Sequence, residues 1–115
     1  MKLQRSSEMF KSSLPFDVEG VFAGLCRLAP GETFPNHFHT SHEEVFFVVS
    51  GVAELWTGRE HRHLLEPGDI ALCERGEQHF LRNVSDKPFV AYFTKSPNLP
   101  QDRVNVEWMP NLGSA

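Results

Sequence analysis

The chain has 115 residues, a formal net charge of −4 at pH 7 and a pI of about 5.8. This length suits one domain, and the acidic balance argues against nucleic acid as a partner. No apolar run approaches the ~20 residues of a membrane helix, and the opening MKLQRSSEMFKSS lacks the apolar stretch of a secretion signal. We therefore expect a cytoplasmic protein with no membrane partner, in which Cys26 and Cys73 are buried thiols.

Short runs rich in β-branched and aromatic residues divide the middle of the chain. They cover residues 21–28, 44–49, 52–57, 61–66, 69–74, 79–84 and 89–95. Turn residues, chiefly proline and glycine, separate neighbouring runs, and no segment between 14 and 95 keeps a helical period. The pattern predicts an all-β domain closed into a small barrel, whose interior is filled by side chains or holds one small ligand.

The two ends of the chain lie outside this barrel core of about 14–95. Residues 3–13 suit either a short helix or an extra edge strand. The tail 96–115 has little periodicity, and we expect it to pack irregularly on the surface. Alternation along the tail predicts three inward side chains, Val104, Val106 and Trp108.

The stretch NHFHTSHEEVFFVVSG, residues 36–51, places metal-binding side chains directly before an apolar strand. His37 and His39 are two apart, so in an extended chain they project to the same face. Glu44 opens the next strand, and His79 belongs to a second polar cluster much later in the chain. Three imidazoles and one carboxylate suit a divalent first-row metal such as Fe, Mn, Ni, Cu or Zn.

The spacing of these residues resembles the first motif of the cupin family. That motif reads G-x5-H-x-H-x3,4-E-x6-G. Its fixed positions are occupied here by Gly31, His37, His39, Glu44 and Gly51.

The second cupin motif reads G-x5-P-x-G-x2-H-x3-N and is matched less completely. Gly68, Gly76, His79 and Asn83 stand at the right spacing, but Glu74 replaces the proline. Because proline restrains a backbone angle, the replacement affects the turn before Gly76. The proline is not a ligand in the family, so the expected metal site is unaffected.

The resemblance implies one cupin domain over residues 1–115, folded as a jelly-roll β-barrel. It also implies one divalent metal ion held by His37, His39, Glu44 and His79. If the ion is octahedral, two positions remain for water or for a chelating substrate. A 2-oxo acid, an enediol or a hydroxy-ketone offers two adjacent oxygens that fit this opening.

Other polar side chains near the motifs have plainer expectations. His42 and Glu43 are expected in solvent, with support of the ligands as the alternative for His42. His61 and His63 suit a solvated hairpin face. Tyr92 is expected to pack with a satisfied hydroxyl. It becomes a candidate catalytic acid or base only if it faces the metal.

Few other residues are candidates for proton transfer or for substrate binding. The further acid/base candidates are Glu54, Cys73 and His63. The candidates for holding a substrate carboxylate are Arg27, Arg82 and Lys95. A surface position is the plainer expectation for each of these three cations.

The family resemblance favours an enzyme that acts on a small oxygen-rich metabolite, of the dioxygenase, isomerase or lyase type. The alternative is a non-catalytic barrel that binds or senses a small molecule, and a structural or storage role fits least. The run 44–49 is apolar on both faces, so its outer face needs a cover. We therefore expect a homodimer, as is common among small cupins.

Overall fold

The computed structural model describes residues 1, 3, 5, 12–17, 20–97, 99 and 102–110, with 12–17 as backbone only. These residues form ten strands. They are β1 (Ser12–Asp17), β2 (Phe22–Leu28), β3 (Thr33–His39), β4 (Glu43–Ser50), β5 (Ala53–Thr57), β6 (His61–Leu65), β7 (Ile70–Cys73), β8 (His79–Asn83), β9 (Phe89–Ser96) and β10 (Arg103–Asn105). The described residues include no helix that could span a membrane. The helix or strand expected over 3–13 falls largely outside the described residues, although β1 begins at Ser12.

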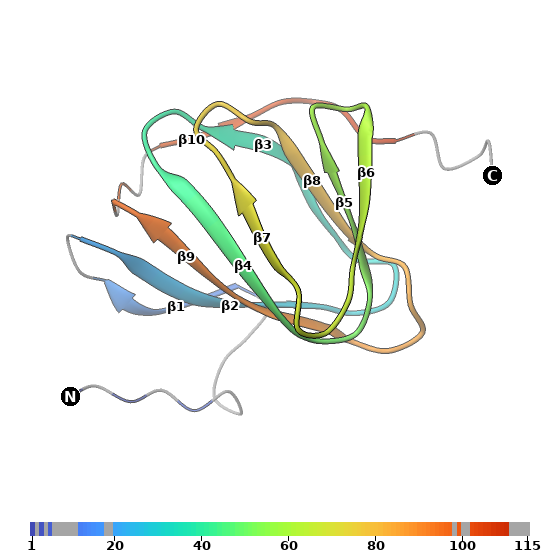
Figure 1. The fold of residues 1–115 in the computed structure, drawn as a ribbon, viewed down its shortest axis with the longest axis horizontal. Helices are drawn as coiled ribbons and strands as arrows, with labels where there is room; N and C mark the ends of the chain where they lie inside the picture. Colours follow the sequence, from blue (N-terminus) through green and yellow to red (C-terminus); the bar gives the residue numbers. More distant parts are fainter. Residues whose placement is uncertain are drawn as a thin grey trace.

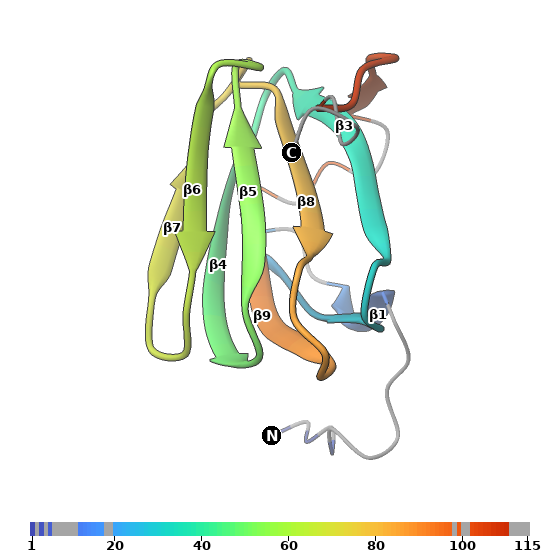
Figure 2. The same ribbon diagram turned by 90° about the vertical axis from the view of Figure 1, so that its right-hand side faces the viewer.

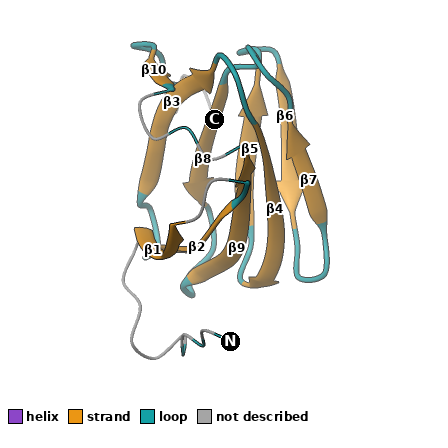
Figure 3. Ribbon diagram, turned by 90° about the vertical axis from the view of Figure 1, so that its left-hand side faces the viewer, coloured by secondary structure: helices purple, strands orange, loops and turns teal. Residues whose placement is uncertain are grey.

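The strands form two antiparallel sheets that pack face to face (Figures 1 and 2). The first sheet has the order β1-β2-β9-β4-β7, and the second has the order β10-β3-β8-β5-β6. Neighbours such as β2 and β9 are distant in the sequence, which is typical of a jelly roll. The connections gather at the two ends of the sheets (Figure 3). The predicted all-β jelly-roll barrel is confirmed.

Alternating side chains of both sheets fill the space between them. In β4, Phe46 points inward and is buried, whereas Phe47 points outward and is 41 % exposed. Cys26 and Cys73 are both buried and form no disulfide, as predicted. The interior is thus apolar over most of its length, and the polar residues of the two motifs interrupt it at one end.

The tail after β9 returns to the second sheet, where β10 pairs with β3. The ring of Trp108 packs over the outer face of this sheet, with its centroid 6.0 Å from Trp56 and 6.1 Å from Phe80. Val104 lies opposite Phe38 and is 39 % exposed, so the inward position expected for it is wrong. Trp108 was expected to face inward as well, but it packs on the outside of the same sheet.

Candidate metal centre

Two imidazoles of the site come from β3. His37 and His39 project from the same face of this strand into the interior, and both are buried. The pairing with β8 places His79 directly opposite His37, and their ring centroids are 4.2 Å apart. The register between β3 and β8 shifts between Phe34 and His37, where Pro35 has no N–H to donate to the ladder.

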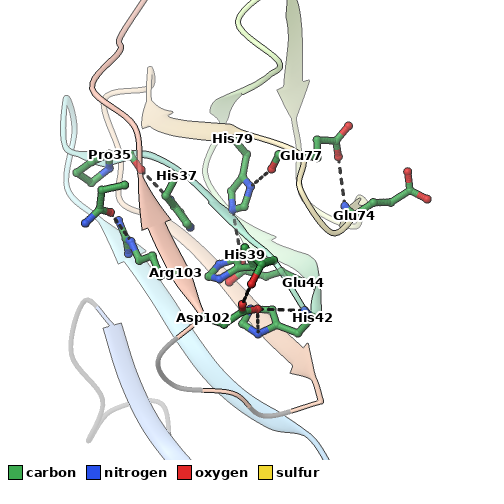
Figure 4. A network of polar contacts seen from close by, with 12 residues as sticks. Pro35, His37, His39, His42, Glu44, Glu74, Glu77, His79, Asp102 and Arg103 are labelled. Atoms are coloured by element: carbon green, nitrogen blue, oxygen red, sulfur yellow. Dashed lines mark hydrogen bonds and ion pairs between the residues drawn. The ribbon is translucent and has the colours of Figure 1, made fainter.

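The carboxylate of the site comes from the other sheet. Glu44 lies near the start of β4 and is buried. Its Oε1 is 3.0 Å from Nε2 of His79 and 3.4 Å from Nε2 of His39. Figure 4 shows these side chains turned toward one another. One ligand atom from each of the four predicted residues lies within 4.8 Å of all the others.

Backbone carbonyls fix which ring nitrogens face the centre. Nδ1 of His37 lies 2.8 Å from the carbonyl oxygen of Pro35, and Nδ1 of His79 lies 3.1 Å from that of Glu77. Each Nδ1 can donate its proton to the carbonyl, which leaves the lone pair of Nε2 for an ion. Metal-binding histidines are commonly held in this way.

The donor set fits a metal ion. Both ring nitrogens of His39 are buried without a hydrogen-bond partner among the described residues. A buried polar atom without a partner costs free energy, of the order of 1–3 kcal/mol. An ion bound by Nε2 would remove part of this cost, and three imidazoles with one carboxylate are the ligands that divalent first-row metals accept.

The electrostatics of the centre favour one proton on His79, next to the negatively charged carboxylate of Glu44. Burial and the nearby His79 lower the pKa of His37 to about 3. Burial also opposes a charge on His79, but its contacts with Cys73 and Glu44 prevail and raise its pKa to about 10. The same contacts with histidines outweigh burial for Glu44 and hold its pKa well below its usual range. Without an ion, a proton on His79 therefore offsets the charge of Glu44.

Tyr92 does not reach this centre. It lies on β9 between the inward residues Ala91 and Phe93, points to the outside of the first sheet and is 41 % exposed. The condition for its role as acid or base, that it faces the metal, is therefore not met.

The other acid/base candidates lie in different places. Glu54 is on the outer face of β5, where Arg62 and Arg82 contact its carboxylate. His63 is exposed on β6. Only Cys73 is inside the barrel, where it is the cross-strand neighbour of Glu44.

His42 is buried, with 1 % of its surface exposed, so the expectation that it lies in solvent is wrong. Its ring centroid is 4.0 Å from that of His39, and its Nδ1 is 3.2 Å from Oδ2 of Asp102. Burial and the neighbouring His39 lower the pKa of His42 to about 4. Asp102 comes from the tail, and no pattern in the sequence pointed to it.

Glu74, at the position of the family's proline, begins a hydrogen-bonded turn that covers residues 74–77. The N–H of Glu77 donates to the carbonyl oxygen of Glu74 over 3.1 Å, and the N–H of Glu74 donates to Oε1 of Glu77 over 3.3 Å. The N–H of Gly76, which has a φ of 76°, donates to the carbonyl of His39 over 2.7 Å. The Glu77 carboxylate thus satisfies the N–H that a proline would lack (Figure 4).

A cavity of about 50 Å³, open to solvent on one side, adjoins the centre. Its polar lining includes His37, Glu44 and His79, together with two cations, Lys95 and Arg103. The remaining walls are apolar and are formed by Cys26, Phe34, Phe46, Leu81 and Phe93. Lys95 was expected at the surface, and Arg103 was not singled out in the sequence.

Known proteins share both this sequence pattern and this fold. The family described as "Cupin domain" matches residues 24–95. The tetracenomycin polyketide synthase protein TcmJ of Streptomyces glaucescens is 30% identical over 98 residues, which cover 82% of this chain and 64% of TcmJ. The chain thus spans less than two thirds of the length of this relative.

Solved structures extend the comparison to the fold. An uncharacterised double-stranded β-helix protein of Klebsiella pneumoniae has a TM-score of 0.79 at 22% identity, covering 93% of this chain and 92% of that one. Oxalate oxidase in complex with the substrate analogue glycolate has a TM-score of 0.69 at 24% identity, covering 76% of this chain and 46% of that one. These likenesses concern the fold, and the family match rests on the sequence. The chain belongs to the cupin family.

Proposed function

We propose that this protein binds one divalent transition-metal ion and acts as an enzyme on a small, oxygen-rich metabolite. The proposal is supported by one observation above all. His37, His39, Glu44 and His79 come from three strands in two sheets, yet their ligand atoms lie within 4.8 Å of one another at a cavity. A buried group of this composition is costly to maintain unless it binds something.

The side chains around the centre have separate tasks in this proposal. The carbonyls of Pro35 and Glu77 orient two of the imidazoles. The apolar walls, among them Phe46 and Phe93, limit water around the bound molecule and strengthen electrostatic interactions there. When bound, the ion supplies either Lewis-acid polarisation of a substrate oxygen or activation of O₂. Lys95 and Arg103 line the same cavity and bring positive charge to it.

The reaction class is proposed as dioxygenase, isomerase or lyase. Four protein ligands on an octahedral ion leave two positions, which suit a substrate with two adjacent oxygens. A second candidate function, capture of a small molecule without turnover, is favoured by a different observation. Glu44 is the only carboxylate among the described residues that line the cavity, and it is needed as a ligand.

Elemental analysis of protein purified without chelators tests the metal site. Near-stoichiometric Fe, Mn, Ni, Cu or Zn is expected in the wild-type protein, and loss of most of it in His39→Ala. His61→Ala is the matched control, because His61 is exposed on β6. Equal metal content in the wild type and in His39→Ala would refute the proposed site.

Turnover then separates the candidate functions. Oxygen uptake with enediols and aromatic diols supports the dioxygenase class. Conversion without oxygen supports an isomerase or lyase. Tight binding of a chelating ligand with no conversion in either assay supports the binding protein instead.

We also propose that the outer face of the first sheet binds a second copy of this chain. On this face Phe47 of β4 lies between Ile70 of β7 and Tyr92 of β9, which are its cross-strand partners. The exposed fractions of Ile70 and Leu72 reach 68 % and 53 %. An exposed apolar face without charge at its centre can pack against the same face of a second copy, as in the two-fold interface of a homodimer.

A further inference from the structure

Two cations reach the cavity because the strand register pairs each of them with a proposed metal ligand. Lys95 of β9 is the cross-strand partner of Glu44. Arg103 of β10 is the cross-strand partner of His39. Residues directly opposite each other in an antiparallel pair project to the same face of the sheet. One cation from each sheet therefore lines the cavity beside the ligands.

The surroundings of Lys95 hold its ammonium group at the cavity wall. Its Nζ lies 5.5 Å from the ring centroid of Phe22 and 5.7 Å from that of Phe93. Such contacts between a cation and a ring face are favourable, and more so where water is limited. The side chain is also half-buried, so it is not a freely solvated lysine.

Arg103 is held in a different way. Its Nε donates to Oδ1 of Asn105 over 2.8 Å, which orients the guanidinium through a neutral partner. Within the described ranges, neither Lys95 nor Arg103 has a carboxylate within 4.0 Å. The nearest negative charge offered by the cavity lining is Glu44, whose pKa is lowered in part by Lys95.

The charge balance of the cavity depends on what Glu44 binds. In the proposed function Glu44 is a metal ligand, and the two charges of a divalent ion exceed its single negative charge. Both cations, Lys95 half-buried and Arg103 exposed, are then left without a counter-charge beside the apolar walls of the cavity. A ligand with two anionic groups would offset much of this positive charge, and guanidinium and ammonium groups bind carboxylates and phosphates strongly.

We propose that the cavity selects a small acid with two anionic groups. One end, a 2-hydroxy or 2-oxo carboxylate, meets the metal, and the other, a carboxylate or a phosphate, is held by Lys95 and Arg103. The chelating end rests on the proposed function. The anionic end is held by the two cations, so the selection for it can also be tested without the ion.

Matched pairs of acids test the inference by isothermal titration calorimetry on Mn²⁺-loaded protein. L-malate is compared with 2-hydroxybutyrate, which keeps the hydroxy acid but ends in a methyl group. 3-phosphoglycerate is compared with glycerate in the same way. We expect the member with two anionic groups in at least one pair to bind about tenfold tighter, because a charge-assisted hydrogen bond contributes about 1.5–3 kcal/mol. The pair with the larger ratio of affinities shows whether the anionic end is a carboxylate or a phosphate.

Charge-removing variants assign the selection to the two cations. Lys95→Gln and Arg103→Gln should each reduce the preference to about threefold or less while metal content stays unchanged. Lys87→Gln, in an exposed loop, removes the same charge elsewhere and should leave the preference intact. Titration of metal-free protein should show weaker binding with the same order of ligands.

The outcomes separate this inference from the proposed function. A chain that takes up no metal but prefers the acids with two anionic groups through Lys95 and Arg103 would support the anion site and refute the metal site. Equal affinity within both pairs, or a preference that survives in Lys95→Gln and Arg103→Gln, would overturn the inference whatever the metal content.

Discussion

Asp102 and His42 form a buried pair, with Oδ2 of the carboxylate 3.2 Å from Nδ1 of the imidazole. The same carboxylate accepts hydrogen bonds from the N–H groups of Thr40, Ser41 and His42 over 3.0, 2.8 and 3.1 Å. It thereby fixes the loop that joins β3 to β4. Because His39 ends β3 and Glu44 lies near the start of β4, this loop sets the spacing of two proposed ligands.

Asp102→Ala should therefore weaken metal binding without removing a ligand. The three N–H groups of the loop lose their common acceptor, and the ring of His42 loses its partner beside His39. Changes that disturb the support of a ligand typically cost 10–100-fold in metal affinity, and we expect about that loss. Competition with a fluorescent chelator measures it.

Asp102→Asn keeps an oxygen acceptor and is the matched control, so its loss should be smaller than that of Asp102→Ala. Metal affinity equal to the wild type in Asp102→Ala would show that the loop keeps its shape without the carboxylate.

The stability of the metal-free protein should fall as the pH drops below about 6.5. The pKa of His42 is about 4 in the folded state, against about 6.5 in an unfolded chain. Between these values the unfolded state binds one more proton at this residue, so acid favours unfolding. The contribution of His42 is about 1.4 kcal/mol per pH unit at most, and His37, with its pKa of about 3, acts in the same direction.

Urea unfolding at several pH values between 4 and 6.5 measures this slope. His42→Gln should flatten the slope by about one proton, whereas His61→Gln, at an exposed position, should not change it. An unchanged slope in His42→Gln would mean that His42 takes up its proton in the folded protein.

The turn before Gly76 predicts a dependence between two glutamates. Glu77→Ala should destabilise the wild-type protein by about 1 kcal/mol, because the N–H of Glu74 then loses its carboxylate partner. Glu74→Pro loses the same hydrogen bond but also limits the unfolded chain, so we expect the two effects to offset each other and to leave the stability within about 1 kcal/mol of the wild type.

The double variant tests whether the carboxylate of Glu77 acts through the N–H of Glu74. In a Glu74→Pro background, Glu77→Ala should cost little, since no donor remains to be satisfied. Thermal unfolding of the four proteins gives the coupling free energy, and strictly additive effects would contradict this explanation of the turn.

The apolar outer face of the first sheet predicts the oligomeric state. Ile70→Lys places a charge at the centre of that face, next to Phe47, and should convert a dimer to a monomer at micromolar concentration. Leu64→Lys, on β6 of the other sheet, is the control and should stay dimeric. Light scattering measures both, and a monomeric wild-type protein would remove the prediction.

Much of the fold was predictable because its signals are local. Strands β2 and β4–β9 coincide with apolar runs between turn residues. Strand β3 was not among the predicted runs, because Pro35, Asn36 and the histidines give TFPNHFH little of the usual strand composition. Its pairing with β8 and β10 overrides this weak propensity.

The candidate site was likewise predictable where its residues lie close together in the sequence, and not where it depends on contacts with the tail. Fixed spacings within two short motifs predicted the four residues that the structure brings together. The roles of Asp102 and Arg103 depend on where the tail crosses β3, and no periodicity in the tail specifies that register. His42 was misplaced for the same reason, because its burial depends on a carboxylate from the tail.

The proposed ligands are divided between the sheets, with three on β3 and β8 and one on β4. An ion held by all four would link the two sheets at this end of the barrel and would restrict their movement relative to one another. Hydrogen–deuterium exchange of the amides of β3 and β4 should therefore be slower in the metal-loaded protein than in the metal-free protein.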